Sequence, residues 1–192
     1  MHNPLRMENI EENMLSKEKG LIYVDEIVYS NGAVYRGQVK QITSPELGEE
    51  QESEIVGARH GFGVQVWVDG AKYKGMWKEN RAHGRGCFWH ADGDRFEGDF
   101  LGDKSNGQGT YTCLDGTVYS GNWVDDVQHG QGEAKWPDGS SFVGNYREGK
   151  KHGVGCYTWA EGNKYNGEWK DNMIDGFGTY EWADGRRYEG YW

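Results

Sequence analysis

The stretch YNGEWKDNMIDGFGTYEWADGRRYEG, residues 165–190, decides the fold. From Tyr165 to Trp169, aromatic, glycine and aromatic residues alternate with polar ones. Such alternation with a period of two indicates a β-strand that has one apolar face. Gly155–Trp159 alternates in the same way, so each copy of this pattern is predicted to hold two short strands.

The pattern recurs every 23 residues from Tyr73 to the end of the chain, without a slip. An aromatic residue leads each unit: Tyr73, Phe96, Tyr119, Phe142, Tyr165 and Tyr188. A glycine follows two positions later: Gly75, Gly98, Gly121, Gly144, Gly167 and Gly190. A second aromatic residue comes two positions after that: Trp77, Phe100, Trp123, Tyr146, Trp169 and Trp192. A fixed period of this length is the signature of a repeat architecture. Of the 31 glycines, 26 fall in the repeat columns and are therefore structural spacers, not the mark of a flexible linker.

An earlier, imperfect copy precedes this array and sets the predicted boundaries. Tyr35 and Gly37 match the first two columns, with Val39 in the second aromatic column. Tyr35 and Tyr73 are 38 residues apart, so this unit carries a 15-residue insertion, which falls within 41–59. The insertion contains Pro and several Glu and is predicted to be an exposed, mobile loop. We expect residues 21–192 to form about seven units, preceded by a polar N-terminal segment, residues 1–20.

The turn inside each repeat follows from a parity argument. Pro137-Asp138-Gly139 is typical of a three-residue hairpin loop, with Pro at position i+1 of a type I turn and Gly in the αL conformation. A loop of this length keeps the flanking aromatic residues on one face. The resulting register predicts three cross-strand aromatic pairs: Tyr157–Tyr165, Tyr180–Tyr188 and Phe88–Phe96. It also sets the second Gly of each G-x-G opposite the Gly of the next strand, which leaves bare backbone for a ring to lie over.

The columns from Tyr165 to Gly190 resemble the MORN (membrane occupation and recognition nexus) repeat, and the resemblance covers about residues 31–192. It implies an all-β fold, an elongated single-layer antiparallel meander of β-hairpin repeats. It also implies a scaffolding role, since similar arrays occur in ciliary and cytoskeletal assemblies, junctophilins and plant phosphatidylinositol phosphate kinases. In the N-terminal segment, Met7–Lys19 has apolar residues near helical spacing and is predicted to be a short helix.

The residues offer no chemistry for catalysis or for a cofactor. His60, His83, His129 and His152 share one column, but neighbouring repeats are about 9.5 Å apart and cannot share a zinc ion. The G-x-G pairs are not followed by the helix that a dinucleotide fingerprint needs. Three cysteines without a C-x-x-C motif suit a reducing, cytoplasmic compartment. We therefore expect no catalytic residues, no metal and no cofactor.

Charge limits the other partners. The formal net charge is −10, which argues against nucleic acid because that partner needs a basic stripe. Two small basic groups leave weak peripheral contact with phospholipid as an alternative. The residues of this alternative lipid site are Arg147, Lys150, Lys151, Arg186 and Arg187.

The aromatic face is the predicted partner site. A single-layer sheet has no second layer to cover its apolar face. We expect a partner protein, either an amphipathic helix or a second copy, to lie on it, with Met7–Lys19 covering part of it in cis. The candidate residues are Trp67, Tyr73, Trp77, Phe96, Trp123, Trp136, Tyr146, Trp159 and Trp169. Because the array stops at Trp192 without a polar cap, we also expect more chain, a partner or another sheet edge there.

These features lead to one main hypothesis and two alternatives. The main hypothesis is a non-enzymatic scaffold or adaptor in the cytoplasm, in a cytoskeletal or ciliary assembly. The first alternative is a membrane tether that binds phosphoinositides, as the family name suggests. The second is a regulatory repeat module of a longer enzyme, such as a phosphatidylinositol phosphate kinase.

Overall fold

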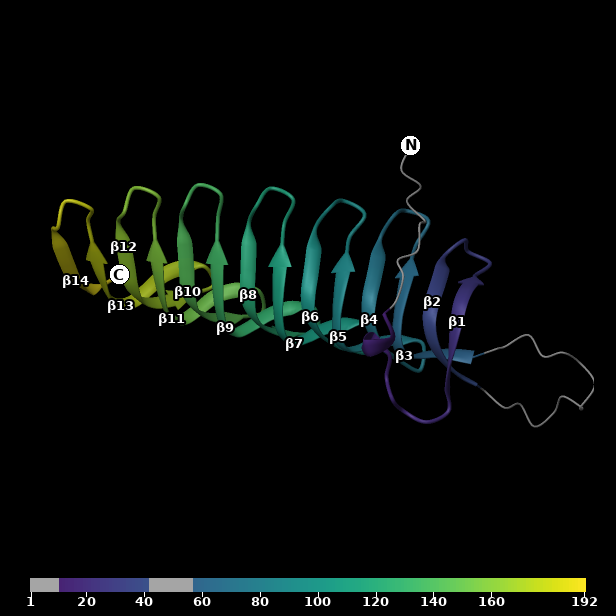
Figure 1. The fold of residues 1–192 in the computed structure, drawn as a ribbon. Helices are drawn as coiled ribbons and strands as arrows, with labels where there is room; N and C mark the ends of the chain where they lie inside the picture. The colour runs from purple at the N-terminus through teal and green to yellow at the C-terminus, as the bar shows by residue number, and fades with distance from the viewer. Residues whose placement is uncertain (1–10, 42–56) are drawn as a thin grey trace, which may run out of the picture. The chain divides into compact units, whose positions relative to one another are not determined.

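The computed structural model describes residues 11–41 and 57–192 and divides into two compact units. The first unit runs to Ala91 and includes Phe100–Asp103, and the second comprises Asp92–Asp99 and Lys104–Trp192. In both units the order of the strands in the sheet is their order in the sequence, so each is an antiparallel meander of hairpins (Figure 1). The all-β fold class predicted from the repeats is confirmed.

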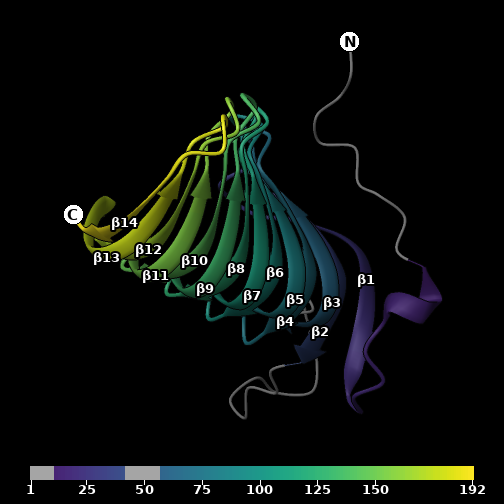
Figure 2. The same cartoon turned by 90° about the vertical axis from the view of Figure 1, so that its left-hand side faces the viewer.

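The elements follow one another as short, regular strands. The first unit holds η1 (Glu12–Met14), β1 (Leu21–Val28), β2 (Val34–Gln41), β3 (Gly57–Val66), β4 (Lys72–Lys78) and β5 (Arg81–Trp89). Strand β6 (Arg95–Leu101) is divided between the units. The second unit holds β7 (Lys104–Thr112), β8 (Val118–Val124), β9 (Val127–Lys135), β10 (Ser141–Arg147), β11 (Lys150–Thr158), β12 (Lys164–Lys170), β13 (Met173–Glu181) and β14 (Arg187–Tyr191). The strands of the second unit are curved along their length (Figure 2).

The Asp-Gly loops are the predicted three-residue turns. The N–H of Gly139 donates to the carbonyl of Trp136 at 3.0 Å, and the N–H of Trp136 donates to the carbonyl of Ser140 at 3.0 Å. Gly139 has a φ of +88°, the left-handed conformation that glycine adopts without strain. The Asp138 carboxylate accepts the N–H of Ser140 at 2.8 Å, which explains why an acidic residue precedes the glycine.

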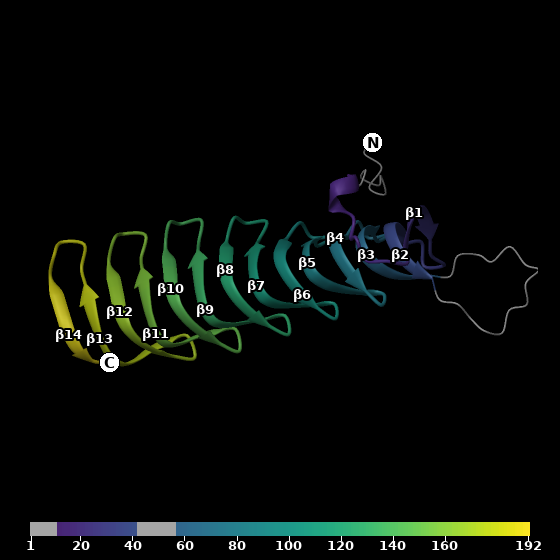
Figure 3. The same ribbon diagram turned by 60° about the horizontal axis from the view of Figure 1, so that its bottom comes forward.

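A second kind of turn joins the repeats at the opposite end of the strands (Figure 3). Between β8 and β9, Asp125 and Asp126 both have positive φ, 48° and 68°. Two consecutive left-handed residues form a type I′ turn, whose twist matches that of the flanking strands. Glu79-Asn80 and Asp171-Asn172 repeat this geometry. Asn and Asp tolerate the left-handed conformation better than other non-glycine residues, so these short polar pairs suit the turn.

Each type I′ turn also holds the first strand of the preceding repeat. The N–H of Asp126 donates to the carbonyl of Ser105, and an Asp126 carboxylate oxygen accepts the Ser105 N–H at 2.6 Å. The Ser105 hydroxyl donates to the same carboxylate oxygen at 3.0 Å. Asn80 with Arg59, Asp103 with Ala82, and Asn172 with Lys151 make the equivalent pairs of backbone bonds. These contacts fix the spacing of successive repeats.

Asp126→Ala is expected to lower the free energy of unfolding by about 2 kcal/mol, because it removes two hydrogen bonds to Ser105 and puts alanine at positive φ. Asp126→Asn keeps the acceptor and the backbone preference and should stay within about 0.5 kcal/mol of the wild type. Urea denaturation of both variants measures the difference. Equal stability of the two variants would show that the turn does not hold Ser105.

The register agrees with the parity argument where the pairing is described. Tyr157 lies opposite Tyr165, and Tyr180 lies opposite Tyr188. Gly155 faces Gly167, as predicted for the second Gly of the G-x-G. The Phe88–Phe96 pair stays a prediction. A β-bulge follows the paired glycines in alternate ladders, as between Gly144 and Tyr146, and it increases the local bend of the strand.

The N-terminal segment departs from its predicted form in the described part. Only η1, a single 3-10 turn, forms between residue 11 and β1, where a helix over Met7–Lys19 was predicted. Residues 1–10 and residues 42–56 of the loop predicted within 41–59 lie outside the described residues. This turn has two backbone hydrogen bonds, Met14 to Glu11 and Leu15 to Glu12, and little cooperativity, so the apolar spacing alone does not sustain a helix.

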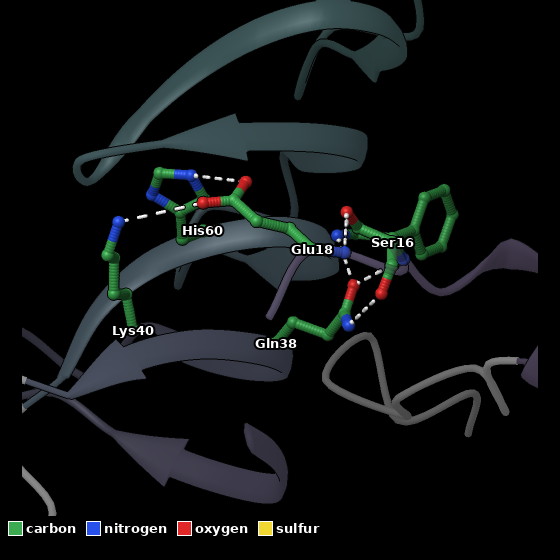
Figure 4. Close-up of polar contacts among 6 residues, drawn as sticks. Ser16, Glu18, Gln38, Lys40 and His60 are labelled. Atoms are coloured by element: carbon green, nitrogen blue, oxygen red, sulfur yellow. Dashed lines mark hydrogen bonds and ion pairs between the residues drawn. The ribbon is translucent and has the colours of Figure 1, made fainter. Parts of the chain in front are cut away.

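The segment after η1 docks on β2 and β3 through polar contacts (Figure 4). The N–H of Ser16 donates to Oε1 of Gln38 at 2.7 Å, and Nε2 of Gln38 donates to the Ser16 carbonyl at 2.8 Å. Glu18 lies 3.3 Å from Nε2 of His60 and 3.6 Å from Nζ of Lys40. These side chains lie on the face of the sheet away from Tyr35, so the described part of the segment contacts the face opposite the aromatic one.

Candidate partner-binding surface

The nine predicted partner-binding residues divide by exposure into two groups. Six are buried, at 1% to 7% exposed: Tyr73, Trp77, Phe96, Trp123, Tyr146 and Trp169. The other three are half-buried: Trp67, Trp136 and Trp159. The structure therefore places most of the predicted surface in the core, where a partner cannot reach it without disturbing the fold.

The buried rings cover one another through edge-to-face contacts, and several of the Tyr and Trp rings also donate a hydrogen bond to the backbone. Tyr165 and Trp169 pack at 80° with ring centroids 5.4 Å apart, a favoured arrangement for aromatic pairs. The Trp169 indole N–H donates to the Gly155 carbonyl at 3.0 Å, and the Tyr165 hydroxyl donates to the Glu168 carbonyl at 3.1 Å. Burial raises the pKa of Tyr165, which keeps the hydroxyl a donor. A curved sheet can thus bury its aromatic columns without a second layer.

A continuous row of half-buried rings remains on the same face of the second unit, near the Asp-Gly loops. We call it the ring row: Trp136, Tyr157, Trp159, Tyr180 and Trp182. Successive centroids lie 5.5, 4.7, 5.3 and 4.7 Å apart, with tilts from 32° to 57°. The rings stack along one another while each leaves part of its surface open. This row is the accessible apolar feature that the aromatic columns provide.

Lys151 lies among the rings at one end of this row. Its ammonium nitrogen is 5.1 Å from the Trp136 ring centroid and 5.2 Å from that of Tyr157. The rings of Phe142 and Trp169 lie 5.5 and 5.7 Å away. Four rings at this distance attract a cation through their quadrupoles. Burial lowers the pKa of Lys151, since the charged form loses hydration there.

Carboxylates flank the ring row on the adjacent loops. Asp138, Glu161 and Asp184 each stand two positions after a tryptophan of the row. The hydroxyl and N–H of Ser140 both donate to Asp138 and lower the pKa of its carboxyl. Asp184 accepts from the N–H and guanidinium of Arg186, and its pKa is lowered as well. The loops next to the rings therefore carry carboxylates, while two cations, Lys151 and Arg186, lie over rings of the row itself.

The five residues of the alternative lipid site do not form one exposed cluster. Arg147 and Lys150 are exposed and pair across the β10–β11 turn. Lys151 is turned into the rings, and Arg186 lies over Trp182 at 5.3 Å while pairing with Asp184 at 2.8 Å. Arg187 pairs with Glu189 at 2.7 Å. Three of the five charges are thus engaged within the chain.

The histidines, cysteines and carboxylates are the remaining groups that could carry other chemistry. Over residues 11–41 and 57–192, no group of three or more His, Cys, Asp or Glu could hold a metal ion. Cys87, Cys113 and Cys156 form no disulfide. Within the same described ranges, no helix is long and apolar enough to cross a bilayer.

Sequence reasoning missed Tyr157, Tyr180 and Trp182 as surface rings and the ring contacts of Lys151. The signal was available in part. Trp136, Trp159 and Trp182 occupy one column that ends a strand beside the Asp-Gly loop. A ring at a strand end lies beside a loop and is less covered by the rings of neighbouring repeats than a ring in the middle of a strand. Column position, and not only the identity of the ring, separates accessible from buried aromatic residues.

Comparison with known families gives a match over most of the chain. The family model described as MORN repeat matches six consecutive segments: residues 57–72, 73–95, 96–118, 119–141, 142–164 and 165–186. No curated protein matches the sequence.

Comparison with solved structures gives weak likenesses at low identity. The SAS-4 (dCPAP) TCP domain of Drosophila melanogaster, solved with a proline-rich motif of Ana2 (dSTIL), has a TM-score of 0.45 at 10% identity and covers 96% of each chain. The TCP10c domain of Drosophila melanogaster Sas-4 has a TM-score of 0.45 at 11% identity, covering 88% of this chain and 97% of that one. The G-box domain of the microcephaly protein CPAP reaches 0.38 at 13% identity, covering 92% and 90%. No functional conclusion follows from likenesses this weak.

Proposed function

The chain belongs to the MORN repeat family, and from this premise we propose that it is a non-enzymatic scaffold that binds a protein partner through the ring row of its second unit. The half-buried state of five adjacent rings is the observation that carries the proposal. Tyr and Trp bury large area at low cost in side-chain entropy and dominate binding energy at interfaces. The repeat geometry supplies a rigid platform for them.

The chemistry of the row favours a protein over a membrane as the partner. The carboxylates of Asp138, Glu161 and Asp184 lie on the adjacent loops and oppose an anionic lipid surface. A partner that presents an apolar stripe flanked by basic residues would match both the rings and the charge. An amphipathic helix has such a stripe, and a second copy of this chain is the other candidate occupant. A cytoskeletal or ciliary assembly in the cytoplasm is the proposed setting, as for similar arrays.

Trp159→Ala is expected to reduce partner recovery about 30-fold, the effect of losing about 2 kcal/mol at a tryptophan hot spot. Quantitative pull-down from cell extract with the full chain measures the recovery, and size-exclusion chromatography with light scattering detects a second copy. Trp159 is central in the row, with Tyr157 and Tyr180 on either side.

Thr158→Ala is the matched control, since Thr158 is next in sequence and points to the other face of the sheet. It should leave recovery unchanged. Both variants must keep the wild-type circular dichroism spectrum. If folded Trp159→Ala recovers the same partners in the same amounts as the control, the ring row is not the binding surface.

A further inference from the structure

One column of the repeat places its side chain on the ring-bearing face at the start of a strand. Its members are Arg59, Ala82, Ser105, Gln128, Lys151 and Ile174, all spaced by the 23-residue period. Both of its cations lie over rings: Arg59 is 4.3 Å from the Trp77 centroid, and Lys151 lies among four rings. The position itself therefore directs a cation into aromatic surroundings.

The rings around Lys151 recur three periods earlier around Ala82. We call the earlier set the Ala82 cage: Trp67, Tyr73, Phe88 and Phe100, each 69 residues before its counterpart Trp136, Phe142, Tyr157 and Trp169. All four belong to the first unit, as does Ala82. Alanine supplies a methyl group where the second unit supplies a lysine side chain.

The ring spacing of the cage is nearly the same with and without the cation. Trp67 and Phe88 have centroids 5.5 Å apart, and Trp136 and Tyr157 also lie 5.5 Å apart. Tyr73 and Phe100 pack at 5.0 Å and 86°, against 5.3 Å and 82° for Phe142 and Trp169. In these two ring pairs the Ala82 cage thus closely resembles the set of rings that receives Lys151, although Trp67 and Phe88 are tilted by 46° against 32° for Trp136 and Tyr157.

The residue that accepts the backbone N–H of the column residue is neutral at Lys151 and negatively charged at Ala82, as expected if the Ala82 cage receives a cation from outside the chain. Beside Lys151, the turn residue that accepts its backbone N–H is the neutral Asn172, at 2.9 Å. Beside Arg59, the corresponding residue is the neutral Asn80, at 2.8 Å. Beside Ala82 it is a carboxylate, Asp103, at 2.7 Å. Burial first, and then the Asp103 charge, raise the pKa of the Tyr73 hydroxyl, so the carboxylate acts on the cage. Ala82 and Ser105, which carry no cation, both have a carboxylate as the turn acceptor, Asp103 and Asp126, whereas the two cations of the column have an asparagine.

We propose that the Ala82 cage binds the cationic end of a lysine or arginine side chain of a protein partner, in the place that Lys151 fills in the second unit. Tyr73 and Phe100 form the buried floor, and the half-buried Trp67 and Phe88 form the accessible rim. Cation–π attraction from four rings and the Asp103 charge select a cation over a neutral side chain. The inference rests on the proposed function only in that the cation is carried by a protein.

The test uses small probes, so it does not depend on the ring row or on knowing the partner. Nα-acetyl-lysine amide and the isosteric Nα-acetyl-norleucine amide are titrated into the ¹⁵N-labelled full chain. The indole N–H resonance of Trp67, assigned with Trp67→Phe, reports the cage. We expect the lysine probe to shift this resonance with a millimolar dissociation constant and the norleucine probe to bind at least tenfold more weakly.

Three variants distinguish the cage from a nonspecific apolar contact. Ala82→Lys supplies the cation in cis and should abolish the response, while Asp103→Asn, which imitates Asn172, should weaken binding severalfold without loss of fold. Lys151→Ala should create a second responding site at Trp136. Equal binding of both probes, or an unchanged response in Ala82→Lys and Asp103→Asn, overturns the proposal. Unchanged partner recovery in Trp159→Ala together with an intact probe response would refute the ring row as the binding surface and leave this inference standing.

Discussion

Gly155→Ala is expected to lower the free energy of unfolding by about 3 kcal/mol, the upper range for forcing one extra carbon into a packed core. A Cβ at this position would lie 2.4 Å from Cζ and 2.6 Å from Cε2 of Phe142, and 3.3 Å from Cα of Gly144. Phe142 is fully buried and cannot move away without disturbing Trp169 and Tyr146, which contact its ring. The cost therefore comes from displaced aromatic packing, not from backbone strain.

Gly139→Ala is the matched control, because it adds the same atom where nothing lies within 4 Å. Gly139 has positive φ, so the alanine should cost about 1 kcal/mol from conformation alone. Urea denaturation compares the two, and hydrogen exchange of β10–β12 amides locates the loosened region. The seating role of the strand glycines would be refuted by a Gly155→Ala protein that is as stable as Gly139→Ala.

The hairpin repeat, its register and its Asp-Gly turn could be predicted from the sequence because each depends on local rules. Alternation from Tyr165 to Trp169 defines a strand. Pro137-Asp138-Gly139 specifies the loop length. Parity then sets Tyr157 opposite Tyr165 without any knowledge of tertiary packing. A fixed 23-residue period repeats the same local solution in every unit, so one correct hairpin accounts for most of the array.

The accessible part of the aromatic face could not be predicted in the same way. Alternation says which face a ring is on, and both Trp159 and Trp169 are on the apolar face. Whether a ring is covered depends on the curvature of the sheet and on its neighbours in adjacent repeats. Trp169 is enclosed by Tyr165, Phe142 and Tyr157, whereas Trp159 lies at a strand end. The contacts with Phe142 and Tyr157 are made between residues of different repeats, so the spacing within a single repeat does not predict them.

The N-terminal segment was mispredicted for a related reason. Apolar spacing near Met14 and Leu15 suggested a helix on the aromatic face, but a short polar segment gains little from a helix alone. Ser16 instead pairs its backbone with the Gln38 side-chain amide, and Glu18 approaches His60 and Lys40. Gln38 occupies a position between the aromatic and glycine columns where a polar residue is expected. The repeat pattern therefore gives no sign that it holds the N-terminal segment.

Trp169→Ala is expected to destabilise the second unit by about 4 kcal/mol, the usual cost of truncating a large aromatic residue in a core. The indole is 6% exposed, donates to the Gly155 carbonyl at 3.0 Å and contacts Phe142, Tyr157 and Tyr165. Its removal leaves a cavity among these rings, which cannot collapse fully because Tyr165 is held by its hydrogen bond to the Glu168 carbonyl and Phe142 packs against Tyr146. It also leaves the Lys151 ammonium with one ring fewer.

Two comparison variants separate this structural role from partner binding. Trp169→Phe keeps a ring but loses the hydrogen bond and the larger indole, and should cost about 2 kcal/mol. Trp159→Ala removes a half-buried ring and should cost less than Trp169→Ala, because part of its surface is already in water. Thermal unfolding and hydrogen exchange rank the three. Were Trp169→Ala to remain as stable as Trp159→Ala, the buried column would not be the core of the second unit. The identification of the ring row as the accessible part of the aromatic face would then lose its basis, because it depends on Trp169 being part of the buried core.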